Sequence, residues 1–279
     1  MMAAFPARAK TLLIVSIQSA LLFITMQLIF VPFANAPRLL GPVSGYLIYS
    51  LYPLLLYLLL VSAHKVFNRL AITNLGFAWR HLPAGIATGF LIGTLAALVS
   101  VTLLALCVPE VFLEFSRQSS TFKELGFLLA NVWQTAFSEE FLFRGYLLLT
   151  LLHRGMRKHS VVIWSALIFA GIHFTVKPAW WLFSTAAAGI LLGSLYISHA
   201  NIWAPVGCHL AINLVFGLIN RDIVLQLNGA ENHLFALMVS QCVVYLVIAR
   251  FAMFFHRQPL QAGTLKSNSG TLPSDESQT

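Results

Sequence analysis

Long apolar runs separated by short polar stretches make up nearly the whole chain as far as residue 255. The first run, Thr11 to Phe33, contains no charged side chain over 23 residues. As an α-helix, a run of that length crosses the ~30 Å hydrocarbon core of a bilayer. Seven further runs follow it: Val43–Ala63, Leu82–Val108, Leu125–Leu152, Val161–Val176, Ala179–Ser198, Trp203–Ile219 and Leu234–Phe255. We therefore expect an all-α fold, a polytopic membrane bundle of about eight transmembrane helices.

The two ends of the chain predict one domain and a tail. Ala34-Asn35-Ala36 mimics a signal-peptide cleavage site, and Pro37 would follow the cut directly. The apolar run before it is longer than the about 7–15 residues of a signal peptide core, so we interpret it as an uncleaved first membrane helix. From Gln258 the chain is polar and rich in Ser, Gly and Thr. We expect residues 1–257 to form an integral membrane domain and residues 258–279 a disordered cytoplasmic tail.

Composition supports the membrane interpretation and argues against nucleic-acid binding. The chain is 58% hydrophobic and only 9% charged, whereas soluble domains carry about 25% charged residues. The net charge of +8 comes from basic residues in short loops beside apolar runs, as membrane topology produces. We therefore expect a lipid bilayer as partner and no nucleic acid. Three widely spaced cysteines predict neither a disulfide framework nor a paired-cysteine metal site.

The basic residues also predict an orientation. The N-terminus and every second loop after it collect eleven of them: Arg8, Lys10, Lys65, Arg69, Arg80, Arg154, Arg157, Lys158, Arg250, Arg257 and Lys266. The other loops collect five: Arg38, Arg117, Lys123, Lys177 and Arg221. Cytoplasmic loops of membrane proteins carry the excess of Lys and Arg, so we expect both termini in the cytoplasm. The short loops and compact size favour a bacterial inner (plasma) membrane.

Glycines at a spacing of four predict close helix contacts. Gly85, Gly89 and Gly93 lie on one face of the third run, and Gly189 and Gly193 repeat the spacing in the sixth. Small residues on such a face let a second backbone approach closely. Packing within the chain is the expected use, and a homodimer contact is the alternative.

Two adjacent carboxylates stand inside the fourth run. Glu139, Glu140 and Arg144 interrupt an otherwise apolar stretch, where each charge costs at least ~2.5–3.5 kcal/mol and usually marks a functional site. Glu140 and Arg144 share a helix face at a spacing of four, while neighbouring residues such as Glu139 and Glu140 point about 100° apart. One carboxylate can thus face a cavity while the other pairs with Arg144. The simpler alternative is an ion pair that only staples helices.

Three later polar residues change the balance between these alternatives. His173 lies near the end of the fifth run, and His209 and Asn213 share one face of the seventh. Each of these three residues alone would usually be explained by a hydrogen bond between helices. Together with Glu139 they supply the parts of a hydrolytic site inside the bundle. A carboxylate can take a proton from water, imidazoles can share that water or help to hold zinc, and an amide can stabilise an oxyanion.

The chain resembles the CAAX protease and bacteriocin-processing (CPBP, or Abi) family of intramembrane endopeptidases, which is related to the type II CAAX prenyl proteases. The family signature reads EExxxR, FxxxH and HxxxN. Here it is Glu139 to Arg144, Phe169 to His173 and His209 to Asn213, in order and each within an apolar run. Each motif alone is weak, whereas the three together are specific. The resemblance covers about residues 125–220, a third of the chain.

The resemblance implies catalytic roles for four residues. Glu139 would activate water together with His173. His209 and Asn213 would bind the developing oxyanion.

Three more residues would support them. Glu140 and Arg144 would brace Glu139, and Phe169 would pack beneath the site.

Family members have been described both as metalloendopeptidases and as glutamate proteases that use no bound metal. In the first case zinc would be held by Glu139, His173 and His209. In the second no cofactor is needed, and the sequence leaves both open.

The function expected is hydrolysis of a peptide bond in a membrane-associated protein or peptide. The resemblance covers CAAX-type processing as well as bacteriocin maturation, self-immunity and peptide-signal processing. A non-proteolytic membrane scaffold or immunity protein is the alternative, and it predicts that Glu139→Gln leaves function intact. A haem-binding protein or proton-coupled carrier that uses His173 and His209 is a third hypothesis.

Overall fold

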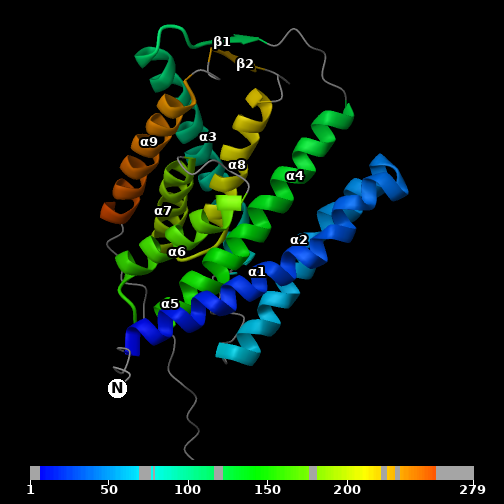
Figure 1. The fold of residues 1–279 in the computed structure, drawn as a ribbon, viewed down its shortest axis with the longest axis vertical. Coiled ribbons are helices and arrows are strands. Elements are labelled where there is room, and N and C mark those ends of the chain that lie inside the picture. The colour runs from blue at the N-terminus through cyan, green and yellow to red at the C-terminus, as the bar shows by residue number, and fades with distance from the viewer. Residues whose placement is uncertain are drawn as a thin grey trace, which may run out of the picture.

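Helices make up almost all of the structure, a computed structural model that describes residues 7–68, 77, 79–115, 122–175, 181–220, 225–229 and 233–255 (Figure 1). The α-helices are α1 (Ala7–Leu40), α2 (Pro42–Ala63), α3 (Leu82–Cys107), α4 (Phe122–Glu140), α5 (Leu149–His153), α6 (Lys158–Ile172), α7 (Leu182–His199), α8 (Trp203–Asn220) and α9 (Leu234–Phe255). Within the described residues, each predicted apolar run lies almost wholly in helix, and the fourth run is continuous from α4 to α5. The predicted all-α membrane bundle is therefore confirmed, while the predicted tail, residues 258–279, lies outside the described residues.

Four short helical segments complete the described helices. Two are π-helices, η1 (His64–Asn68) after α2 and η4 (Phe141–Leu148) between α4 and α5. The other two are 3-10 turns, η3 (Trp79–His81) before α3 and η5 (His173–Thr175) after α6. The predicted fourth run is thus one helical rod whose middle has π geometry.

Within the described residues, five helical stretches are long and apolar enough to cross a membrane. They are Ala9–Phe33, Val43–Phe67, Trp79–Cys107, Leu182–His199 and Leu234–Phe255. Helices α6 and α8 are apolar but shorter. Together they make this a multi-pass membrane protein, and large hydrophobic side chains accordingly cover much of the outer surface.

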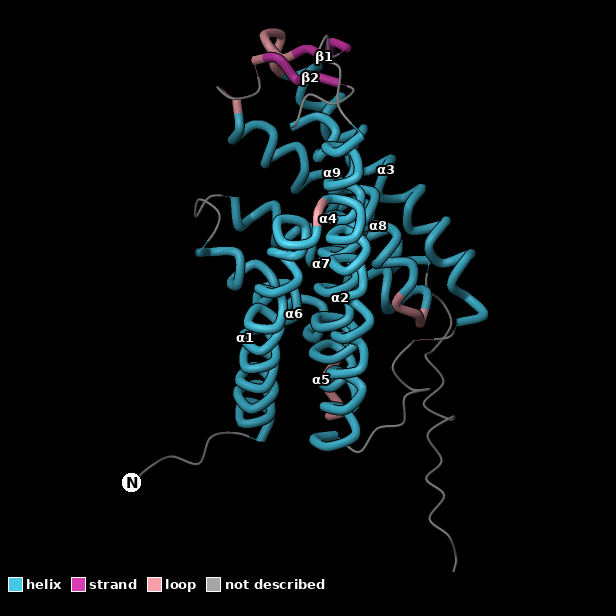
Figure 2. Tube along the Cα trace, turned by 90° about the vertical axis from the view of Figure 1, so that its right-hand side faces the viewer, coloured by secondary structure: helices cyan, strands magenta, loops and turns pink. Residues whose placement is uncertain are grey.

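Successive passes alternate in direction between two ends of the bundle (Figures 1 and 2). Helix α1 begins and α9 ends toward one of them, which we call the terminal end. At the opposite end, β1 (Phe112–Phe115) pairs with β2 (Leu225–Asn228) in an antiparallel sheet, and we call it the strand end.

The two-stranded sheet departs from the purely helical expectation. Phe112 is opposite Asn228 in its register, and the Asn228 side-chain amide donates a 3.2 Å hydrogen bond to Glu114. The sheet joins the α3–α4 connection to the α8–α9 connection. Gly229 follows with φ of 75°, a conformation that glycine adopts at no steric cost.

The glycine face of α3 packs against α8 of the same chain. A Cβ on Gly89 would overlap the carbonyl of Ala204, and one on Gly93 would overlap that of Cys208. The spacing therefore serves packing within the chain, as expected, and it sets α8 close to α3. The homodimer stays a prediction.

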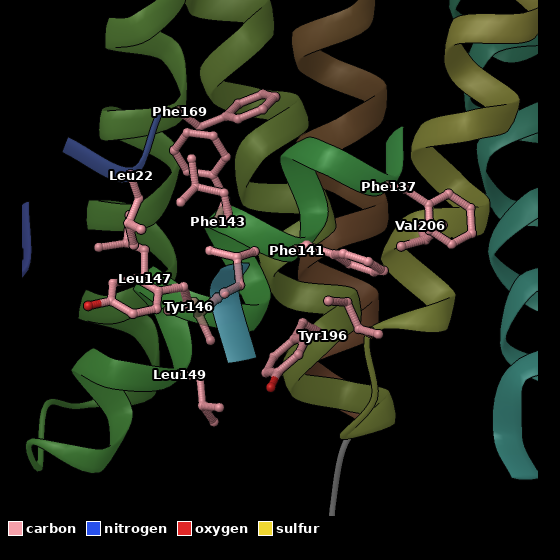
Figure 3. Packing of buried hydrophobic residues seen from close by; sticks show 14 of the residues in the cluster. Leu22, Phe137, Phe141, Phe143, Tyr146, Leu147, Leu149, Phe169, Tyr196 and Val206 are labelled. Atoms are coloured by element: carbon pink, nitrogen blue, oxygen red, sulfur yellow. The ribbon is translucent and has the colours of Figure 1, made fainter. Parts of the chain in front are cut away.

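A buried aromatic core surrounds the segment that carries the glutamates (Figure 3). Phe141 makes edge-to-face contacts with Phe77 at 4.9 Å and with Phe137 at 5.5 Å between ring centroids. Phe143 meets Phe169 of α6 in the same way at 5.0 Å. Aromatic pairs of this kind add about 0.5–1.5 kcal/mol each beyond the area they bury. This packing fixes the end of α4 relative to α6.

Candidate active site

The site begins where α4 turns into the π-helix η4. Glu139 and Glu140 are the last two residues of α4, and all eight residues of η4 are buried. π-Helical turns inside α-helices are rare and often lie at functional sites. The two carboxylates therefore lie directly before a π-helical segment that is buried in the protein.

Glu140 and Arg144 form a fully buried ion pair. Arg144 Nη1 donates to Glu140 Oε1 at 2.9 Å, and neither side chain has exposed surface. Arg144 Nη2 donates to the carbonyl of Gly189 in α7 at 3.0 Å, and its guanidinium carbon lies 5.0 Å from the ring centroid of Phe169. Helix α7 approaches closely at Gly189, where a Cβ would lie 2.9 Å from Ala166. The pair thus ties α4 to α6 and α7.

Glu140 also holds His209 of α8. His209 Nδ1 lies 2.8 Å from Glu140 Oε1, the oxygen that accepts from Arg144. A carboxylate paired with a guanidinium is an acceptor, so His209 Nδ1 carries the hydrogen. The other ring nitrogen, Nε2, then faces Glu139 Oε2 at 3.8 Å. Glu140 therefore contacts His209 directly, whereas the sequence interpretation linked it to Glu139.

His173 reaches the same carboxylate from the end of α6. Its Nδ1 lies 2.8 Å from the carbonyl oxygen of Phe169. A carbonyl can only accept, so Nδ1 is the protonated nitrogen. Nε2 is left facing Glu139 Oε1 at 3.8 Å. The Phe169 ring lies 4.9 Å from the His173 ring and edge-on to His209 at 6.1 Å, so it packs against both imidazoles.

Glu139, His173 and His209 thus converge from three helices. Their side chains are 18%, 15% and 8% exposed, so all three remain reachable from the cavity. The 3.8 Å separations are too long for direct hydrogen bonds, and contacts of that length are often completed by a shared water. The arrangement can therefore hold a small polar atom between one carboxylate and two imidazoles.

A cavity of about 490 Å³ opens from these three side chains. It is lined by residues of α4, α6 to η5, α7, α8 and α9. Asn213 lines it one helical turn beyond His209, as the HxxxN spacing predicts. All four candidate catalytic residues therefore reach one space.

Several neutral polar side chains in the lining were missed from the sequence. Asn131 and Thr135 lie two turns and one turn before Glu139 on the same face of α4, and Ser184, Thr185 and Gln241 line the cavity from α7 and α9. The spacing of four back from Glu139 would have found the first two. The others belong to helices that no local pattern connects to the site.

His64 was also missed, because it lies at the end of an apolar run. It is buried, and its Nε2 donates to the carbonyl of Gly145 inside η4 at 2.8 Å. Its ring lies 4.6 Å from that of Tyr146, whose hydroxyl donates to Gln18 of α1 at 3.2 Å. These contacts brace the π-helix from η1 and α1.

The donor atoms are of the kind that bind zinc. Two imidazole Nε2 atoms and a carboxylate face one another, and each Nδ1–H is held by an acceptor, as is usual for zinc-bound histidines. Yet in the part of the chain described here, no group of three or more His, Cys, Asp or Glu side chains is placed to hold a metal ion. These side chains as placed do not form a metal centre.

Comparison with known proteins matches the part of the chain that carries the candidate catalytic residues. Residues 121–215, from the start of α4 into α8, match the family model described as type II CAAX prenyl endopeptidase Rce1-like. The match includes Glu139, His173, His209 and Asn213. A curated relative, the uncharacterized protein YpbD of Bacillus subtilis (strain 168), is 37% identical over 83 residues, which are 29% of this chain and 39% of YpbD. The chain therefore matches less than half the length of that relative.

Proposed function

We propose that this chain, whose residues 121–215 match the model of the type II CAAX prenyl endopeptidase Rce1-like family, hydrolyses a peptide bond of a membrane-associated protein or peptide with water activated by Glu139. One observation carries the proposal. Glu139, His173 and His209 meet from three helices around one point of a single cavity.

In the first step Glu139 takes a proton from water. The water oxygen attacks the carbonyl carbon of the scissile bond, and a new C–O bond forms as the proton moves to the Glu139 carboxylate. His173 Nε2 faces that carboxylate at 3.8 Å with Nδ1 already protonated, so neutral Nε2 accepts a hydrogen bond from the water and orients it. When the C–N bond breaks, Glu139 returns the proton to the leaving amine.

The carbonyl oxygen becomes negatively charged during the attack and needs hydrogen-bond donors. The Asn213 amide lies on the cavity wall one turn beyond His209 and is a neutral donor. His209 donates from Nε2 only when both ring nitrogens are protonated, because its Nδ1 hydrogen is already bonded to Glu140. The adjoining Glu140 carboxylate supplies the negative partner for that imidazolium. Asn213 and His209 thus form the proposed oxyanion site.

Cleavage of a panel of membrane-tethered and prenylated peptides by the purified protein tests this function. Glu139→Gln keeps the size of the side chain but removes the base, so we expect at least a ~100-fold loss of cleavage rate. Glu124→Gln is the matched control, since Glu124 is exposed on the first turn of the same helix, and it should cleave at the wild-type rate. Cleavage by Glu139→Gln at that rate would favour the scaffold interpretation.

A zinc chelator added to the same assay separates the two forms of the mechanism. The mechanism derived above needs no metal, so cleavage should persist in the chelator. Loss of cleavage that returns on adding zinc would instead assign Glu139, His173 and His209 to a metal ion.

A further inference from the structure

The active-site cavity is open toward one end of the bundle and closed toward the other. From Glu139 and His209 its lining runs to Leu128 in α4, Gly217 in the last turn of α8 and Leu234 at the start of α9. The start of α4, the end of α8 and the start of α9 lie toward the strand end of the bundle (Figure 1). The cavity therefore extends from the carboxylate toward the strands.

On the opposite side of the glutamates the space is filled with side chains. Phe143 and Leu147 in η4 and Tyr196 near the end of α7 are each at most 3% exposed and belong to one buried hydrophobic cluster (Figure 3). The Glu140–Arg144 pair, with no exposed surface, adds to this layer. A peptide cannot reach Glu139 through it without disrupting the core.

The two ends also differ in charge. Among the described residues, eight basic ones belong to segments at the terminal end (Arg8, Lys10, Lys65, Arg80, Arg154, Arg157, Lys158 and Arg250) and two to segments at the strand end (Arg38 and Lys123). Membrane proteins retain Lys and Arg on the cytoplasmic side, and short loops such as these decide the orientation. By this rule the terminal end is cytoplasmic and the strand end is on the outer side.

We infer that the active site receives its substrate from the outer face of the membrane, as an extended peptide segment at that surface. The inference rests on the proposed function for the chemistry and on the cavity and charges for the side. The scissile bond must then be presented on the outer side of the membrane, a point that the hydrolysis reaction alone does not determine.

The polar side chains that line the cavity favour an extended conformation of the bound peptide. Asn131, Thr135, Asn213 and Gln241 supply neutral amide and hydroxyl groups along the cavity. A helical peptide has its backbone groups paired internally, whereas an extended one in apolar surroundings needs outside partners for each N–H and C=O. Amides and hydroxyls both donate and accept, so they serve either kind of group. The cavity suits an unwound segment and not an intact membrane helix.

Cysteine labelling in intact cells tests which side of the membrane the cavity faces, and it does not depend on enzymatic activity. In a variant whose three native cysteines are replaced by serine or alanine, Leu234→Cys marks the cavity mouth and His159→Cys marks an exposed position at the terminal end. We expect a membrane-impermeant maleimide to label Leu234→Cys in intact cells and His159→Cys only after permeabilisation. Labelling of His159→Cys in intact cells, or of Leu234→Cys only after permeabilisation, overturns the inference.

Vesicles of both orientations test the substrate side. A charged, membrane-impermeant peptide that the detergent-solubilised protein cleaves should be cut at least about tenfold faster by right-side-out than by inside-out vesicles, because a charged peptide does not cross the bilayer freely. Faster cleavage by inside-out vesicles overturns the inference and leaves the protease intact. Absence of cleavage in detergent by wild type contradicts the proposed function, and labelling still decides the side.

Discussion

At the scale of single residues, Glu140 is the most constrained group in the site. Its Oε1 accepts from both Arg144 and His209. Its Oε2 has no hydrogen-bond partner among the described residues. The carboxylate therefore depends on Arg144 for its charge balance, while His209 depends on the carboxylate for its orientation.

Replacing Arg144 should separate these two dependences. Arg144→Met leaves Glu140 as a buried unpaired charge and should cost about 3–5 kcal/mol of stability. Adding Glu140→Leu removes that charge and should restore most of the stability, whereas cleavage should stay low because His209 has lost its acceptor. Unfolding in detergent and the peptide assay measure the two effects. Wild-type cleavage by the double variant would show that Glu140 does not position His209.

Motif spacing was sufficient to name the residues that meet in the cavity. The contact between Glu140 and His209 was not foreseen, because it joins positions 69 residues apart on different helices. A spacing of four predicts which residues share a face, as for Glu140 and Arg144. It does not predict which helix lies opposite that face.

At the scale of elements, the π-helix η4 sets the direction of the two glutamates. His64 donates to the Gly145 carbonyl within it, and Tyr146 links it to Gln18 of α1. A side chain that bonds to a helix carbonyl in this way can stabilise a local distortion of the helix. His64 is thus a positioning residue for the active site, although it touches none of the catalytic side chains in the contacts described above.

Replacing His64 tests whether the π-helix needs this brace. His64→Ala leaves the Gly145 carbonyl without this donor and should cost about 1–3 kcal/mol in unfolding experiments. The cleavage rate constant kcat should fall because Glu139 is displaced, with little change in KM. His199→Ala, at an exposed histidine, is the control. An unchanged kcat in a destabilised His64→Ala protein would restrict His64 to a purely structural role.

The α3–α8 contact places the helix that carries His209 and Asn213. Gly89→Ala would put a methyl group into the Ala204 backbone of α8, so we expect a loss of about 1–3 kcal/mol from overpacking. Gly171→Ala is the matched control, since a Cβ there meets nothing within 4 Å. It should be neutral or slightly stabilising, because alanine favours helix over glycine. Thermal unfolding in detergent compares the two, and equal stability would contradict the packing.

At the scale of the whole molecule, the apolar pattern predicted the helical passes closely. The run Val43–Ala63 became α2 (Pro42–Ala63), and Leu82–Val108 became α3 (Leu82–Cys107). Membrane helices are well predicted because each satisfies its own backbone. The β1–β2 sheet was not predicted, since its strands are about a hundred residues apart and pair only once the bundle has brought them together.

The cavity draws on more of the chain than the family match does. Leu234, Leu237, Gln241 and Tyr245 of α9 form part of its wall, and all four lie beyond residue 215, where the match ends. An inhibitor anchored on Glu139 alone would act on any protein that shares the matched segment and its chemistry. Selectivity for this protein must come from groups that reach across the cavity to α9. Compounds for a selective probe should therefore be built outward from the carboxylate toward that helix.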